Sequence, residues 1–157
     1  MVRSCGRRRL VGILVVSTGF LGSIPVAAQQ VNEYDQTLAR VTRLLPRAPD
    51  KIVVIDADAS GRSLHDKLQH VEGFVTHGER VVYLVRQGET LQRAMKGAGI
   101  FDYALAITIW HEMAHIDGAD EANARQAEEQ LWGQFVLEGR VDGVRGMKYL
   151  ALLKSRR

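Results

Sequence analysis

The sequence predicts one small α+β domain. Several segments have helical periodicity, and two short runs rich in β-branched residues, 51–55 and 81–85, are typical of strands. The 157 residues allow a single core, and neither a linker rich in Pro, Ser or Gly nor an internal repeat divides them. A small sheet packed against helices is therefore the expected architecture.

The first 28 residues have the pattern of an export signal. Four arginines lie within the first nine residues, and no acidic residue precedes Glu33. An apolar run, 10–26, ends in small residues just before Gln29, as signal peptidase requires. We expect residues 1–28 to be a cleaved signal peptide and residues 29–157 to form a secreted or periplasmic domain. Glycines and a proline in the run argue against a retained membrane anchor, and both the general and the twin-arginine export routes stay open.

Removal of the signal changes the charge and the cysteine content. The full chain has 21 Lys and Arg against 18 Asp and Glu, a formal net charge of +3. Without the four signal arginines, 17 basic residues face the same 18 acidic ones, so the mature chain is near −1. We therefore expect no nucleic-acid partner and no membrane contact after cleavage. The one cysteine, Cys5, is also removed, so a metal would need His and carboxylate ligands.

The first half of the mature chain predicts one helix and three strands. Apolar side chains recur at helical spacing over 31–45, and prolines end that pattern. Residues 51–55 (KIVVI) predict a strand that ends in a turn. Residues 73–75 and 81–85 predict two further strands, with a turn at 77–78 between them.

The second half predicts helices. Residues 91–96 form a short one, and a more hydrophobic helix follows, DYALAITIWHEMAHID, with Asp102 as its expected cap. A glycine ends that helix, and Asp120 caps the next one, 121–137. A last helix is expected over 141–153. Because the DYALAITIW stretch is apolar on nearly every side, its helix should lie at the centre of the domain.

The hydrophobic helix contains an HExxH motif, His111-Glu112-Met113-Ala114-His115. Side chains at i and i+4 lie about 6 Å apart on one helical face, so His111 and His115 can take two corners of a tetrahedral zinc site. Glu112 projects beside that face and can act as general base and acid toward a water on the metal. A bound Zn²⁺ also accounts for three polar groups in an apolar helix. Two histidines hydrogen-bonded to carboxylates, without metal, are the alternative.

A zinc site of this kind needs a third protein ligand, and the next helix offers carboxylates. Glu128 falls inside the apolar arc of residues 121–137 and comes level with the two histidines in an antiparallel helix pair, so it is the expected ligand. Glu129, toward the edge of that arc, is a second choice. Glu121 is another, because HEMAHIDGADE is similar to the longer zinc signature HExxHxxGxxH with Glu121 in the place of the last histidine. Met147 and Tyr149 (GMKY) also resemble the methionine turn of the zinc enzymes that carry the longer signature.

With these residues the chain resembles the zincin-like metallopeptidases of the gluzincin type, in which a Glu on a following helix completes HExxH. The resemblance covers roughly residues 51–138. It implies a minimal zincin-like domain with one Zn²⁺ that hydrolyses peptide or protein substrates, with Glu112 as the catalytic residue. It also implies that the strand 81–85 binds the substrate backbone as an added strand. The unranked candidates for stabilising an oxyanion are Tyr83, Tyr103, His77 and Tyr149. The alternative function is a secreted zinc-binding module of the same fold without turnover.

Overall fold

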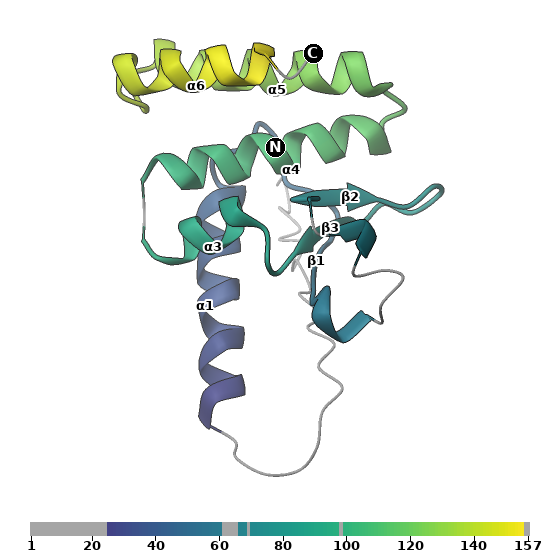
Figure 1. Ribbon diagram of the computed structural model, residues 1–157. Helices are drawn as coiled ribbons and strands as arrows, with labels where there is room; N and C mark the ends of the chain where they lie inside the picture. The colour runs from purple at the N-terminus through teal and green to yellow at the C-terminus, as the bar shows by residue number, and fades with distance from the viewer. Residues whose placement is uncertain (1–24, 61–65, 69, 98, 156–157) are drawn as a thin grey trace, which may run out of the picture.

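A computed structural model describes residues 25–60, 66–68, 70–97 and 99–155 (Figure 1). These residues form helices and a small three-stranded mixed sheet, so the α+β class expected from the sequence is confirmed. Residues 1–24 of the expected signal peptide, Cys5 included, lie outside the described part of the chain. Helix α1 (Pro25–Thr42) spans the expected cleavage point. Among residues 33–42 of this helix, the buried side chains are Tyr34, Thr37, Leu38 and Val41.

The sheet has the strand order β1-β3-β2, with β1 (Ile52–Ile55), β2 (Gly73–Val75) and β3 (Val82–Val85). Strand β3 pairs in parallel with β1 and antiparallel with β2. All three strands lie where the sequence predicts them, but β3 is central. The expectation that residues 81–85 bind a substrate backbone is therefore wrong, because β1 and β2 occupy both edges of β3. Strand β2, at the edge of the sheet, is the strand that packs most extensively against helix α4.

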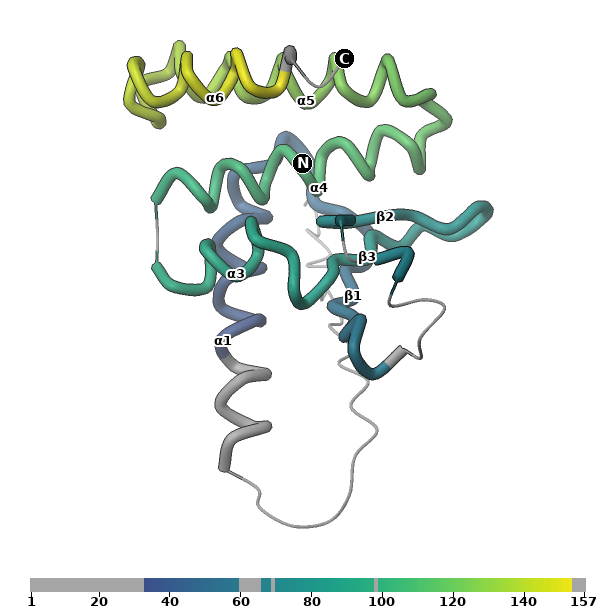
Figure 2. The backbone as a smooth tube through the Cα atoms, in the orientation of Figure 1, coloured from purple at the N-terminus to yellow at the C-terminus, as the bar shows by residue number. Residues whose placement is uncertain are grey.

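Helix α4 (Ile100–Ile116) lies at the centre of the domain, as predicted (Figures 1 and 2). Helices α1 and α3 (Glu89–Met95) and the sheet pack on one side of it. Helix α5 (Glu121–Leu137) packs on the other side, and α6 (Gly143–Ser155) packs against α5. The buried apolar residues of α4 are Ala104, Leu105, Ala106, Ile107, Ile109 and Met113. Contacts on several sides explain why this helix has no polar face over most of its length.

An ion pair with α1 holds the N-terminal end of α4. Arg40 donates from Nε and Nη2 to the two carboxylate oxygens of Asp102, at 2.7 and 2.9 Å, and Nη2 also donates to the Ala94 carbonyl oxygen at 2.8 Å. The expectation that Asp102 caps the helix is wrong, because α4 begins at Ile100 with Gly99 as its N-cap and has no side-chain cap. Asp102 is instead buried and neutralised by Arg40.

The turn from α4 to α5 follows the sequence-based expectation. Gly118 ends α4 with a φ of +93°, a left-handed conformation that favours glycine, and Asp120 caps α5 by accepting a backbone hydrogen bond at 2.9 Å. Helices α5 and α6 then approach closely. Trp132 is fully buried and donates from Nε1 to the Gly146 carbonyl oxygen at 2.8 Å. A Cβ on Gly146 would lie 2.5 Å from Val136 Cγ2, so a larger residue at this position would clash with Val136 and push the two helices apart.

Candidate metal centre

The HExxH motif lies in the last turns of α4, where this helix faces both α5 and strand β2. A cavity of about 480 Å³ opens between these elements. Its lining includes residues 71–75 around β2, His111, Glu112 and His115 of α4, and Glu121, Arg125, Glu128 and Glu129 of α5. The structure therefore brings the two histidines and every carboxylate considered as a third ligand to one cavity.

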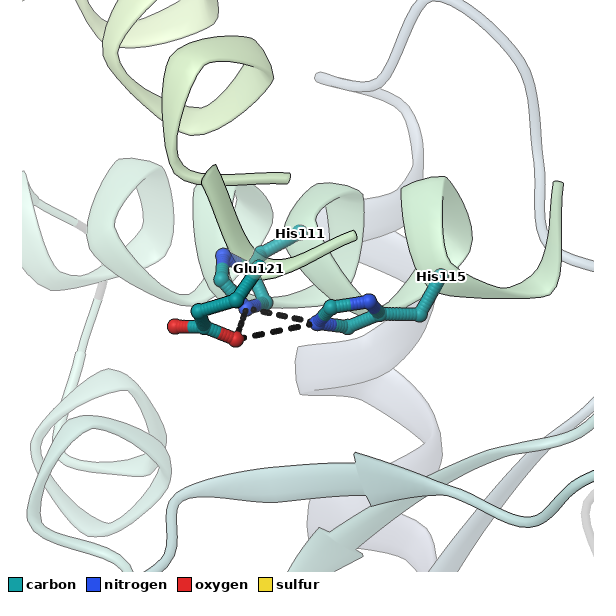
Figure 3. A group of neighbouring side chains, drawn as sticks. All are labelled: His111, His115 and Glu121. Carbon is teal, nitrogen blue, oxygen red and sulfur yellow. Dashed lines mark hydrogen bonds and ion pairs between the residues drawn. The ribbon is translucent and has the colours of Figure 1, made fainter. Parts of the chain in front are cut away.

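Three potential ligand atoms converge in this cavity (Figure 3). The Nε2 atoms of His111 and His115 are 3.1 Å apart. Glu121 Oε2 lies 3.6 Å from the first of these atoms and 3.3 Å from the second. The one-turn spacing along α4 places the two imidazoles next to each other, and the short turn before α5 brings the first residue of that helix to them.

The dimensions of this triangle match a zinc site. Zinc binds histidine nitrogen at about 2.0–2.1 Å and carboxylate oxygen at about 2.0–2.2 Å. With sides of 3.1, 3.3 and 3.6 Å, the triangle places a point about 2.05 Å from all three atoms at a height of about 0.7 Å above their plane. In an ideal tetrahedron the ion lies one third of a bond length above the plane of three ligands, which is also about 0.7 Å. The residues present therefore fit a four-coordinate ion with one position left for another ligand.

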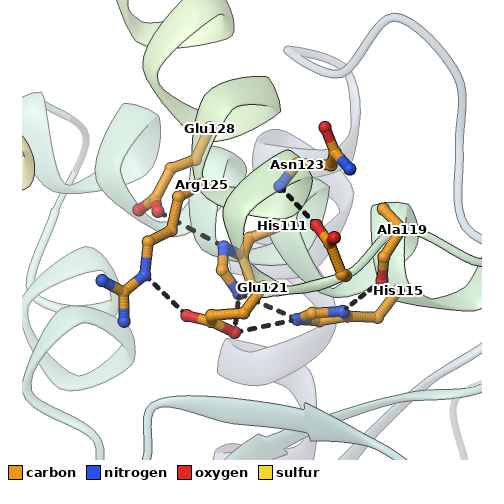
Figure 4. A network of polar contacts seen from close by, with 8 residues as sticks. His111, His115, Ala119, Glu121, Asn123, Arg125 and Glu128 are labelled. Carbon is orange, nitrogen blue, oxygen red and sulfur yellow. Dashed lines mark hydrogen bonds and ion pairs between the residues drawn. The ribbon is translucent and has the colours of Figure 1, made fainter. Parts of the chain in front are cut away.

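The polar contacts of the imidazoles also favour a cation (Figure 4). His115 Nδ1 lies 2.9 Å from the Ala119 carbonyl oxygen, which can only accept, so the proton of a neutral ring is on Nδ1. His111 Nδ1 faces Glu128 Oε2 at 3.4 Å, which favours the same tautomer. Both Nε2 atoms then present bare lone pairs to each other and to the Glu121 carboxylate. Three converging acceptors need a proton or a metal ion between them.

Glu128 does not point at the side of His111 that faces His115. The ion-pair contact of Glu128 Oε2 with His111 Nδ1, at 3.4 Å, falls outside hydrogen-bond geometry, and this nitrogen has no hydrogen-bond partner among the described residues. Burial lowers the pKa of His111, but the neighbouring carboxylates, Glu128 foremost, outweigh this effect and raise the pKa overall. An oxygen on the Nδ1 side cannot bind an ion held at Nε2 of the same ring, so in this geometry Glu128 supports His111 rather than completing the triangle. Glu129 lines the same cavity.

Glu112 is buried beside the two histidines, with 8% of its surface exposed. Burial raises the pKa of its carboxyl group, while the charges of His111 and His115 act in the opposite direction. A Cβ placed on Gly73 would lie 3.5 Å from Glu112 Cγ, so Glu112 packs directly against strand β2. A buried carboxylate with a raised pKa is the kind of group that transfers protons in active sites.

Sequence reasoning missed Arg125. Its Nε donates to Glu121 Oε1 at 2.6 Å, and its side chain lines the cavity. Burial acts to raise the pKa of Glu121, but the hydrogen bond from Arg125 and the nearby imidazoles lower the pKa overall. The four-residue spacing of Glu121 and Arg125 on a predicted helix is a known pairing signal and could have identified Arg125 from the sequence.

Other expected site residues lie elsewhere. None of the four candidates for stabilising an oxyanion lines the cavity, and Tyr83 donates instead to Glu79 Oε2 at 2.7 Å. Met147 is exposed on α6 and does not line the cavity either. His70 and Arg125 are the basic side chains besides His111 and His115 that the described part of the chain contributes to the cavity lining.

Comparisons with known proteins add no relative. No protein-family model matches the chain, and no curated protein or solved structure matches it at a significant level. The candidate metal centre therefore stands on its own geometry.

Proposed function

We propose that this chain is an exported zinc metallopeptidase of the zincin type. The observation that carries the proposal is the convergence of His111 Nε2, His115 Nε2 and Glu121 Oε2 within 3.1–3.6 Å, beside the buried carboxylate of Glu112. In this proposal the three converging residues hold Zn²⁺, with Glu121 as third ligand in place of the sequence-based first choice, Glu128. Glu128 and the Ala119 carbonyl orient the imidazoles through their Nδ1 atoms.

The chemistry expected of the chain centres on Glu112. A zinc ion bound here would supply Lewis acidity, which lowers the pKa of a water molecule and polarises a carbonyl group. Glu112 accepts the proton of the attacking water on its carboxylate and then donates it to the leaving amine. Its burial favours the first step, because a raised pKa makes the carboxylate a stronger proton acceptor.

Strand β2 is the proposed docking edge for a peptide substrate. Among the described residues β2 pairs with β3 alone, so the backbone groups of its other edge have no strand partner and could pair with an added strand. The residues around β2 line the cavity, and Gly73 packs against Glu112. A peptide extended along this edge would therefore pass next to the proposed catalytic carboxylate.

The expected location is the periplasm or the exterior of the cell. This part of the proposal rests on the signal-like pattern of residues 1–28. Within the described residues, no helix is both long and apolar enough to cross a membrane.

The first test is metal content. Elemental analysis of the purified mature chain should give one zinc per molecule, and H111A should lose it. Substoichiometric zinc in both proteins would contradict the metal assignment. For the chemistry, E112Q should keep zinc and lose hydrolysis of a peptide library by at least about a hundredfold, the lower range for a general base. Turnover equal to that of the unsubstituted protein would remove Glu112 from its role.

One observation favours a second function, a secreted zinc-binding module without turnover. No Tyr expected to stabilise an oxyanion lines the cavity. The buried Glu112 favours the enzyme, because a purely structural site gains nothing from a buried carboxylate next to an open position. Zinc bound at one equivalent, together with no hydrolysis of any peptide in the library, would support the module.

A further inference from the structure

The two oxygens of the Glu121 carboxylate have different partners, and Arg125 is the partner of one of them. Its Nε donates to Oε1 at 2.6 Å, whereas Oε2 faces His111 Nε2 and His115 Nε2 (Figure 4). Arg125 lies one helical turn after Glu121 on α5, and about a third of its side chain is exposed. One carboxylate oxygen is thus engaged by the guanidinium, and the other is directed at the histidines.

Glu121 needs such support, because packing does not hold it. It is the first residue of α5, and 57% of its side chain is exposed. A carboxylate in this position is free to rotate away from the histidines or to turn both oxygens toward a metal. The hydrogen bond from Arg125 Nε opposes both movements, because a charged donor 2.6 Å from Oε1 holds that oxygen on the side away from the histidines.

We propose that Arg125 is a positioning residue that fixes Glu121 as a one-oxygen metal ligand. The inference rests on the proposed metal site. It explains how the fourth coordination position stays open: a carboxylate binding through both oxygens would occupy it, and a closed site cannot activate water.

Positioning and simple charge predict opposite effects of removing Arg125. A guanidinium near a dication repels it, so if charge dominated, R125Q would bind zinc more tightly. If positioning dominates, R125Q binds zinc more weakly, because Glu121 must be ordered each time an ion binds. Lysine separates the two further, since R125K keeps the charge and loses the planar fork.

The chain contains a matched control. Glu89 is also the first residue of a helix, α3, and also pairs with an arginine four residues later, with Arg93 Nη2 2.5 Å from Glu89 Oε1. Neither residue lines the cavity. R93Q therefore removes an ion pair of the same spacing and position in a helix without touching the proposed site.

The experiment measures zinc affinity by competition with a chelator for the unsubstituted protein, R125Q, R125K and R93Q. Supporting partners of metal ligands typically contribute 10–100-fold in affinity, so we expect about tenfold weaker binding for R125Q. R125K should bind more weakly than the unsubstituted protein, and R93Q should bind equally well. The visible spectrum of the cobalt-substituted protein should change in R125Q and not in R93Q, because it reports coordination geometry.

Several results would overturn the inference. Unchanged or tighter zinc binding by R125Q would do so, as would R125K binding like the unsubstituted protein. An altered melting temperature with an unaltered zinc affinity would reduce Arg125 to a structural ion pair. If the unsubstituted protein itself binds no zinc, the proposed function fails as well. If it binds zinc and R125Q binds equally well, only the role of Arg125 fails.

Discussion

Exchanging Glu121 and Glu128 for glutamine, one at a time, distinguishes a metal ligand from a residue that orients one. Glu121 Oε2 lies 3.3 and 3.6 Å from the two Nε2 atoms, whereas Glu128 Oε2 lies 3.4 Å from Nδ1 of His111, on the other side of that ring. Glutamine has nearly the same size as glutamate and removes only the charge, so each substitution should leave the α4–α5 packing intact.

The expected magnitudes differ by about a factor of ten or more. The free energy of zinc binding at structural sites is roughly 10–16 kcal/mol at pH 7, so one of three protein ligands accounts for on the order of 3–5 kcal/mol of binding free energy. E121Q should therefore weaken zinc binding by a few hundredfold to a few thousandfold. E128Q removes a supporting partner and should weaken it by about 10–100-fold.

Zinc dissociation constants from chelator competition, measured at one pH and ionic strength, test this order. E89Q is the control, because Glu89 occupies the equivalent first position of α3 and pairs with Arg93 at the same spacing. A larger loss for E128Q than for E121Q would refute the argument from the nitrogen atoms and restore Glu128 as third ligand. Equal binding by E121Q and E89Q would exclude Glu121 as a ligand.

Three further predictions concern stability. R40M leaves the buried Asp102 carboxylate without its guanidinium partner and should lower the free energy of unfolding, measured with urea, by about 2–4 kcal/mol. This loss is smaller than that expected for a fully buried ion pair, because Arg40 is partly exposed. A change within about 0.5 kcal/mol would contradict this prediction. Burial raises the pKa of Glu112, so ionisation of this residue destabilises the folded protein above the pKa that Glu112 has in the unfolded chain. E112Q should therefore be more stable than the unsubstituted metal-free protein at pH 7, and this difference should vanish near pH 4. A difference that does not depend on pH would refute burial as the cause. G118A should destabilise the protein by about 1 kcal/mol, because φ is +93° at this position. G133A lies inside α5 with open space around it and should stabilise the protein by about 0.5–1 kcal/mol. Changes of the same sign in the free energy of unfolding, measured by chemical denaturation, would contradict both arguments.

Local rules predicted the parts of the fold that local interactions determine. The Asp120 cap, the Gly118 terminus and the positions of the three strands all follow from residue types within a few positions. Asp102 shows the limit of that reasoning. An aspartate before a hydrophobic helix is typical of a cap, but here a guanidinium 62 residues earlier in the chain takes both its oxygens. Such a partner depends on how α1 packs and is not visible in the neighbouring sequence.

The third ligand illustrates the same limit inside the site. Helical periodicity correctly places Glu128 on the inner side of α5, where it is partly buried and faces His111. Periodicity cannot say which ring nitrogen it meets. That depends on the turn at 118–120, which brings Glu121 to the Nε2 atoms and the Ala119 carbonyl to His115 Nδ1. The strand order has a similar origin, because the sequence identifies β3 as a strand but not its two neighbours.

Removal of a zinc ion from the proposed site should leave the protein folded. Leu131, Trp132 and Phe135 already hold α5 in the core, and an ion joining His115 to Glu121 closes only a short loop, so it restricts the unfolded chain little. With excess chelator, the near-ultraviolet circular dichroism at 25 °C should persist, and the melting temperature should fall only by the amount that ligand linkage requires. Loss of the folded signal on chelation would instead indicate a structural zinc site on which folding depends. A protein that folds without the ion does not need a zinc site closed by four protein ligands. The proposed site can therefore keep one coordination position open for water or substrate, as catalytic zinc sites do.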